Sequence, residues 1–123
     1  MNDHNKYSIN LEIQFQPLEI IDIAKKIDES TKNWQNVSLC MVNDSVVRLA
    51  VIEGEFHWHK HENEDEFFYV IEGSLFIDLE DKTIELKPIQ GITIPKGVIH
   101  RTRAPTRTSV LLVEKNTVIP TGD

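Results

Sequence analysis

The sequence has little of what stabilises small secreted proteins or carries a chain into a membrane. Cys40 is the only cysteine, which excludes a disulfide framework and a zinc site built from cysteines. No apolar run approaches the roughly 18 residues of a membrane-spanning helix. The first residues also lack the apolar segment of a signal peptide. We therefore expect a cytoplasmic protein.

Basic residues are scarce relative to acidic ones, with 13 Lys and Arg against 20 Asp and Glu and a net charge of −7. Binding to nucleic acid or to an anionic membrane requires a basic surface, so neither is an expected partner. The hydrophobic fraction of 40% and the charged fraction of 27% are typical of globular domains. A chain of 123 residues suits one folded unit.

Helical periodicity is confined to one segment near the N terminus. Residues 9–16 alternate apolar and polar side chains, which predicts a half-buried strand. From Pro17, apolar residues recur at helical spacing, and proline suits a first helical turn, so we predict a helix over 17–29. His4 belongs to the polar residues 1–8 and is expected to be a solvated tail residue.

The rest of the chain is a series of short apolar segments separated by turn residues. The predicted strands are 37–42, 45–52, a histidine-bearing strand after Gly54, 66–71, 75–79, 83–86, 92–94, 99–104 and 108–114. Glu72-Gly73-Ser74 predicts a hairpin between two of them. This pattern indicates an all-β sandwich or barrel with one N-terminal helix. We assign residues 1–33 to the N-terminal strand and helix of this unit, 34–115 to the barrel and 116–123 to a polar tail.

Two of the predicted strands are apolar on both faces, namely Phe67–Ile71 and Val110–Val113. A strand in a monomeric sandwich needs only one apolar face. We therefore expect the second face to be covered in a homodimer. Cover by the 17–29 helix alone is the alternative.

Histidines form the most informative pattern in the chain. His57, His59 and His61 alternate, so on a strand their side chains would share one face. Glu66 begins the next predicted strand, and His100 lies on a later one. Imidazole is the commonest transition-metal ligand, and three imidazoles with one carboxylate suit divalent iron, manganese, nickel, copper or zinc.

Two motifs resemble those of the cupin superfamily. Gly54-x4-His59-x-His61-x4-Glu66-x6-Gly73 looks like its first motif, and Gly91-x3-Pro95-x-Gly97-x2-His100 resembles its second. The resemblance implies an antiparallel double-stranded β-helix, the RmlC-like jelly-roll barrel. It also implies a metal inside the barrel held by His59, His61, Glu66 and His100, and pairing of subunits as dimers.

The sequence departs from the family pattern at three positions. Gly91 lies closer to Pro95 than is usual, Ala104 stands where the family often has asparagine, and His57 is an extra histidine. A competing register would use His57 and His59 with Glu64, but only Glu66 gives the six-residue spacing to Gly73. His57 is then expected inside the barrel near its mouth. It is the candidate catalytic base; the alternatives are a residue that supports a metal ligand and an inert polar residue.

The predicted barrel favours a small-molecule ligand. Strand parity lines the cavity with apolar side chains such as Phe68, Val70, Phe76 and Ile94. The same parity points Arg101 and Arg103 outward, which weakens a phosphosugar substrate because its phosphate needs basic partners. The best hypothesis is a metal-dependent oxygenase-type enzyme. A metal-dependent isomerase of sugar or keto-enol chemistry, or a non-catalytic small-ligand-binding cupin, with or without a metal in use, are the alternatives.

Overall fold

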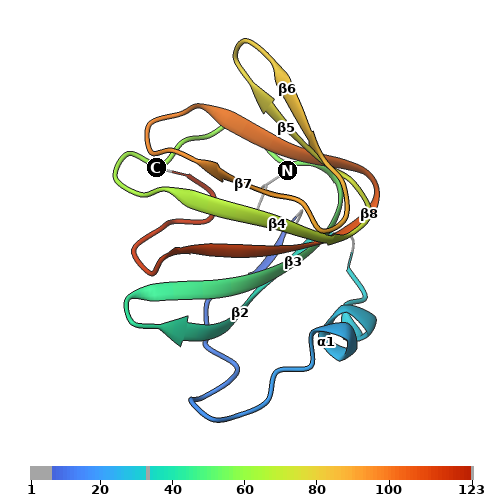
Figure 1. Cartoon of the computed structure of the whole chain (residues 1–123), viewed down its shortest axis with the longest axis vertical. Coiled ribbons are helices and arrows are strands. Elements are labelled where there is room, and N and C mark those ends of the chain that lie inside the picture. Colours follow the sequence, from blue (N-terminus) through green and yellow to red (C-terminus); the bar gives the residue numbers. More distant parts are fainter. Residues whose placement is uncertain (1–6, 33, 123) are drawn as a thin grey trace.

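The computed structural model describes residues 7–32 and 34–122, which form a mostly antiparallel β-structure with one short helix (Figure 1). His4 lies outside the described residues. In chain order the elements are β1 (Ser8–Asn10), α1 (Ile23–Glu29), β2 (Trp34–Val42), β3 (Ser45–Glu55), β4 (Glu66–Glu72), β5 (Leu75–Leu79), β6 (Thr83–Leu86), β7 (Gly91–Ile94) and β8 (His100–Lys115). In this part of the chain, no helix has the length and apolar character needed to cross a bilayer.

Strand β8 connects the two layers of the structure. Its first residues pair with β5, so that Arg103 lies opposite Phe76. Its later residues pair with β3 on one side and β4 on the other. Between these parts Pro105, which has no N–H to donate, lies exposed without a ladder partner. We predicted separate strands over 99–104 and 108–114; the chain instead stays extended through Pro105 and forms one strand.

The turn at Gly73 does not close the predicted hairpin. Strand β4 pairs with β7 and β8, whereas β5 pairs with β6 and β8, so β4 and β5 are not neighbours. Gly73 has a φ of 88°, and a Cβ there would lie 2.9 Å from the Cα of Thr108. The chain therefore passes from one layer to the other at this glycine instead of folding back. The predicted fold class, an all-β jelly-roll barrel with one N-terminal helix, is confirmed.

The N-terminal elements are shorter than predicted. The strand predicted over 9–16 ends at Asn10, and the helix predicted over 17–29 begins at Ile23. Leu18 has a φ of 74°, which a helix does not accommodate, and the Asp22 side chain caps the helix by accepting from the Lys25 N–H. Leu18 is fully exposed, so the apolar pattern before residue 22 is not the buried face of a helix.

Apolar side chains pack on both faces of the larger layer. The inner cluster fills the barrel and includes Trp34, Phe56 and Phe68. The outer cluster packs β2 and β3 against the N-terminal segment, and Ile27 of α1 is one of its buried members. Figure 1 shows α1 on the side of this layer that β2 and β3 form. The helix thus covers part of the outer face, while Phe67 of β4 remains 37% exposed.

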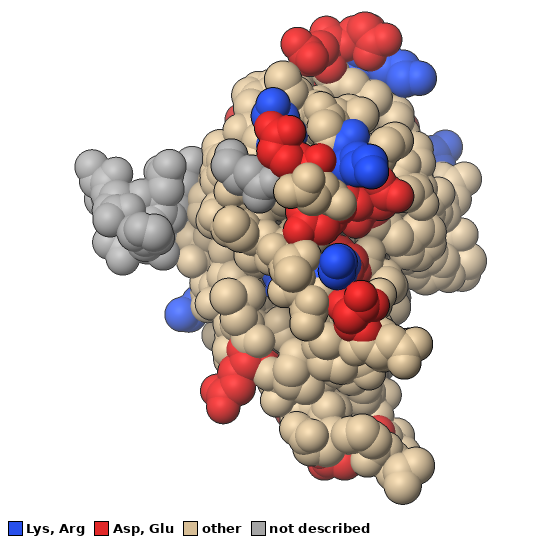
Figure 2. All heavy atoms as spheres, turned by 90° about the vertical axis from the view of Figure 1, so that its left-hand side faces the viewer, with Lys and Arg blue, Asp and Glu red and all other residues tan. Residues whose placement is uncertain are grey.

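The molecular surface carries charges of both signs. On the face shown in Figure 2, acidic and basic side chains are interspersed, with uncharged surface below them. The basic side chains on this face do not form a continuous patch. This distribution fits the excess of acidic residues in the sequence.

Candidate metal centre

The histidine-bearing segment is a loop that touches β8 at one point. The register of β3 against β8 shifts between Ile52 and Gly54, and Gly54 has a φ of 108°. Pairing resumes at Gly54 and Glu55, but β3 ends at Glu55, so the strand predicted there is wrong. An isolated antiparallel bridge joins His59 to His100, with both N–H···O distances at 2.9 Å. This bridge brings the two histidine-containing motifs together.

Four of the predicted site residues meet inside the barrel: the candidate ligand atoms of His59, His61, Glu66 and His100 all lie within 4.8 Å of one another. The Nε2 atoms of His61 and His100 lie 3.1 and 3.2 Å from Glu66 Oε1. His61, Glu66 and His100 are 2%, 5% and 1% exposed. The cluster is therefore compact and nearly closed to solvent.

Two backbone carbonyls orient the imidazoles. His59 Nδ1 donates to the His57 carbonyl at 3.0 Å, and His100 Nδ1 donates to the Val98 carbonyl at 2.9 Å. A carbonyl can only accept, so Nδ1 carries a proton in both rings. In the neutral form of each ring Nε2 therefore keeps the lone pair that can bind a metal. Fixing the tautomer through a backbone carbonyl is the usual outer support of a metal-binding histidine.

The protonation states suit a cation. Burial lowers the pKa of His59 to about 4, so this imidazole is neutral at pH 7. Burial alone would raise the pKa of Glu66, but the ring nitrogens of His100 and His61 outweigh it and hold that pKa well below its usual range. A neutral imidazole and an ionised carboxylate are the forms in which these groups bind metals.

The geometry leaves these atoms without the partners that buried polar groups normally have. Glu66 Oε1 and His100 Nε2 are buried, close together, and without a hydrogen-bond partner among the described residues. Buried polar atoms are otherwise almost always satisfied. Three nitrogens and one oxygen that converge in this way fit a divalent transition metal.

A second buried carboxyl supports Glu66 from behind. Glu114 of β8 lies opposite Glu66 of β4, is 4% exposed, and its Oε1 lies 3.3 Å from Arg48 Nη1. Burial and the adjacent Glu66 raise the pKa of Glu114 to about 9. Sequence reasoning missed Glu114 and left Arg48 unplaced. Strand alternation could have located Glu114: it shares the parity of Val110 and Leu112, which face inward.

His57 does not join the cluster. Its Nε2 lies 2.6 Å from the Thr121 carbonyl, and its ring stacks on Phe56 at 4.2 Å. Phe56 lines the cavity and His57 does not, so the interior position predicted for His57 is wrong. His57 and His59 do not share one face, because the regular strand ends before them at Glu55. Its catalytic role stays a prediction. Glu64 of the competing register accepts a hydrogen bond from Thr117 at 2.7 Å and also lies outside the cluster.

The C-terminal segment contributes to the site, although we predicted only a polar tail there. Val118 is buried, Pro120 lines the cavity, and the Thr121 carbonyl contacts His57. Gly122 lies so close to His59 that a Cβ on Gly122 would come within 3.1 Å of the imidazole Cγ. Sequence periodicity could not reveal this segment, because its contacts depend on a reversal of chain direction after β8.

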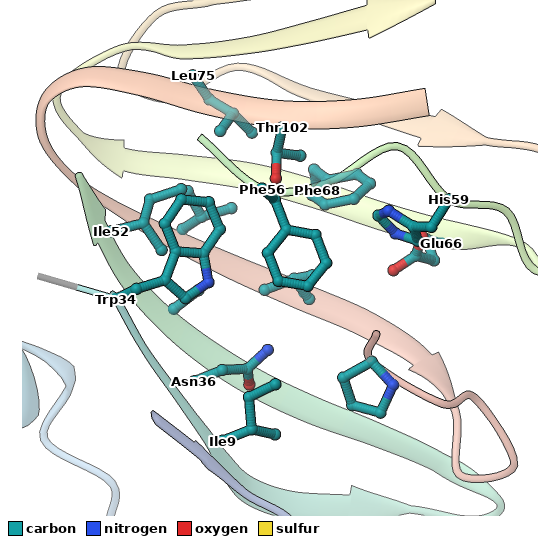
Figure 3. Close-up of a pocket in the computed structure, with 14 residues that line it drawn as sticks. Ile9, Trp34, Asn36, Ile52, Phe56, His59, Glu66, Phe68, Leu75 and Thr102 are labelled. Carbon is teal, nitrogen blue, oxygen red and sulfur yellow. The ribbon is translucent and has the colours of Figure 1, made fainter. Parts of the chain in front are cut away.

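An apolar cavity of about 50 Å³ opens onto the cluster. Figure 3 shows His59 and Glu66 at one end, Trp34 and Ile52 at the other, and Phe56 and Phe68 between them. The remaining lining residues are Ile9, Asn36, Ala50, Leu75, Thr102, Val110, Leu112 and Pro120.

The prediction from strand alternation of which side chains line the cavity is correct in part. Phe68 lines the cavity, and Val70 and Ile94 lie in the inner cluster. Phe76 instead contacts the Arg103 guanidinium at 4.7 Å. The prediction for Phe76 is wrong, because its neighbours Leu75 and Ile77 take the inner positions on β5.

Arg101 and Arg103 point away from the cavity, as predicted. Their Nε atoms both donate to Asp78 Oδ2 at 2.8 Å, and Thr83 donates to the same carboxylate at 2.7 Å. The hydrogen bond from Arg103 has the largest effect on the pKa of Asp78. Together with the bond from Arg101 it outweighs burial and holds that pKa below its usual range. Arg107, the third basic residue of the segment, donates to carbonyls of Ile27 and Ser30.

Comparison with known proteins agrees with this geometry. The chain belongs to the cupin family, since the model described as "Cupin domain" matches residues 45–114. An uncharacterized Bacillus subtilis protein, YdbB, is 47% identical over 96 residues, which cover 77% of this chain and 82% of that relative. The crystal structure of a cupin-2 domain protein from Shewanella frigidimarina has a TM-score of 0.75 and 33% identity, covering 78% of this chain and 94% of that chain.

A shorter match is to polyketide synthase CurC of Streptomyces cyaneus. It is 44% identical over 45 residues, or 37% of this chain, and the matched part covers only 29% of that relative.

Proposed function

We propose that this cupin binds a divalent transition metal through His59, His61, Glu66 and His100, and that the metal acts on a small molecule held in the apolar cavity. The observation that carries the proposal is the convergence of four ligand atoms at one end of that cavity. Among the described residues, the cavity is lined by no Lys, Arg or Asp side chain. The ligand is therefore small and uncharged away from the metal.

An oxygenase-type reaction fits this site better than an isomerase. Bound divalent iron would supply reactivity towards molecular oxygen. The chain would orient the substrate against aromatic walls and exclude water. Isomerisation needs a side chain that moves a proton, and among the described lining residues only His59 and Glu66 ionise; both belong to the ligand set. Phosphosugars also lack a basic partner in the cavity.

The short match to a polyketide synthase supports a carbon-rich substrate. Polyketide chains are rich in carbonyl and enol oxygens, which bind metals, and their unsaturated bodies suit the walls formed by Trp34, Phe56 and Phe68. Because the chain spans under a third of that relative, the substrate class remains a proposal.

Oxygen consumption tests the proposed reaction. Protein loaded anaerobically with Fe(II) should consume oxygen in the presence of a panel of small phenols and 1,3-diketones, and the His100→Ala variant should not. Turnover without oxygen by Zn(II)- or Mn(II)-loaded protein would indicate an isomerase instead. Ligand-dependent stabilisation without turnover under either condition would indicate a binding protein.

We also propose that two subunits pair through the outer face of β4 and β8. Phe67 and Val113 lie opposite each other on these strands and are both 37% exposed. Apolar area of this kind beside a partly covered sheet face favours a second subunit. Analytical ultracentrifugation should give a dimer for the wild type and a monomer for Phe67→Glu. A monomeric wild type at micromolar concentration contradicts the proposal.

A further inference from the structure

The cavity contains a polar atom that the metal cluster does not use. Asn36 Oδ1 is buried and has no hydrogen-bond partner among the described residues. The side chain lines the same cavity as His59 and Glu66. A buried acceptor without a donor is costly, so this atom indicates either a ligand group that donates to it or a trapped water.

The backbone fixes the position of Asn36. It lies on β2 between two strands, opposite Ile9 of β1 and Ala50 of β3. Trp34, two residues earlier on the same strand, lines the same cavity. Because the strand is paired on both sides, the Asn36 side chain cannot turn outward without loss of this register.

The space between Asn36 and the cluster suits a flat apolar body. The Trp34 and Phe56 rings are stacked, with centroids 5.3 Å apart and planes at 18°. Figure 3 shows Asn36 and His59 on different sides of the Phe56 ring, with the Thr102 hydroxyl directed towards the interior. A planar unsaturated ligand would contact the aromatic side chains with its faces and reach both polar ends.

We propose that Asn36 is a specificity-determining residue that accepts a hydrogen bond from a hydroxyl or amino group of the ligand. The ligand class is a small, planar, uncharged hydroxylated aromatic or enolised compound whose other end contacts the metal. This inference rests on the proposed function in one respect only, namely that one end of the ligand contacts the metal. An anionic group at Asn36 is disfavoured, because the lining offers it no cation.

A matched pair of probes tests the hydrogen bond. Resorcinol and 3-methoxyphenol differ by one methyl group, which removes one donor. Calorimetric titration of Zn(II)-loaded protein should show about tenfold tighter binding of resorcinol to the wild type, since the ether leaves the buried acceptor unsatisfied. Asn36→Leu, of similar volume, should abolish the preference. Gln35→Leu on the same strand but outside the cavity lining should retain it.

Equal binding of the two probes to the wild type, no binding of either, or a preference that persists in Asn36→Leu would overturn the inference. The first of these results would show that the probe does not donate to Asn36. Zinc content measured on the same samples separates the failure of the proposed function from the failure of the inference about Asn36. If the wild type holds no zinc, the proposed function fails, and the same titration on metal-free protein decides whether Asn36 selects the donor.

Discussion

Strand β8 carries carboxylate-centred clusters on its opposite faces, and they differ in how well their hydrogen bonds are satisfied. On the outer face, Asp78 accepts aligned hydrogen bonds from Arg101 and Arg103 at 2.8 Å. On the inner face, Glu66 Oε1 lies 3.2 Å from His100 Nε2, yet neither atom has a hydrogen-bond partner among the described residues.

The difference shows what kind of site each cluster is. The outer cluster pairs fixed cations with a carboxylate, so its charges are already compensated. The inner cluster presents imidazole nitrogens and a carboxylate oxygen towards one another, an arrangement that a bound cation would satisfy. The outer cluster is complete as a surface ion-pair network, whereas the proposed metal would complete the inner cluster.

The largest expected effect is on metal affinity, which should depend on the Glu66 carboxylate and not on that of Asp78. Glu66→Gln should weaken Zn(II) binding several hundredfold, since a four-ligand zinc site contributes on average about 3–4 kcal/mol per ligand. Asp78→Asn should bind Zn(II) as the wild type does. Competition with a fluorescent chelator measures both constants. Equal losses in the two variants would remove the distinction between the clusters.

The next largest effect is the pH dependence of folding stability that His59 gives to the inner cluster. The unfolded chain protonates His59 near pH 6.5, whereas the folded, metal-free protein does so only near pH 4, so protonation favours unfolding. Stability present above pH 6.5 should therefore fall by about 3 kcal/mol as the pH drops to 4. Urea unfolding of wild type and His59→Gln measures this contribution as the difference between their pH profiles. Parallel profiles would contradict a buried neutral imidazole.

Metal removal should produce a slightly smaller change. A ligand at a hundred times its Kd stabilises the folded state by about 2.7 kcal/mol, which for a domain of this size raises Tm by about 10 °C. Calorimetry with and without a chelator should show this loss for wild type and for Asp78→Asn. Glu66→Gln, in which the site is already damaged, should be nearly insensitive to chelation. A chelator effect of the same size in all three proteins would place the metal elsewhere.

The smallest effect concerns the outer cluster alone. Asp78→Asn should destabilise the fold by about 1 kcal/mol, because its arginine partners are partly exposed and solvent screens the lost interaction. Denaturant unfolding at two salt concentrations measures this value and its screening. A loss of several kcal/mol would show that the outer cluster is as essential to the fold as a buried pair.

The β-structure could be predicted from local spacing, and the inner cluster from the resemblance of two motifs to those of the cupins. The alternation of His100, Arg101, Thr102 and Arg103 placed the histidine inside and the arginines outside, and the structure agrees. The resemblance to the cupin motifs implied the set of four residues that the fold brings together. Whether that set binds metal stays a prediction.

The remaining features depend on contacts that local spacing does not encode. Parity failed for His57 because the regular strand ends at Glu55, and the predicted helix begins late, at Ile23, because Leu18 adopts a positive φ. The predicted hairpin at Gly73 failed because pairing with β8 took precedence over pairing of sequence neighbours. Homodimer formation and the division of residues 1–33, 34–115 and 116–123 stay predictions.

Metal content tests the central claim most directly, and the adjacent histidines provide the control. Mass spectrometry of protein purified without added chelator should find near-stoichiometric transition metal in wild type and in His57→Ala, whose side chain lies outside the cluster. His59→Ala should lose the metal. A wild type without metal, or a His59→Ala variant that retains it, would contradict the account of the inner cluster as a metal centre.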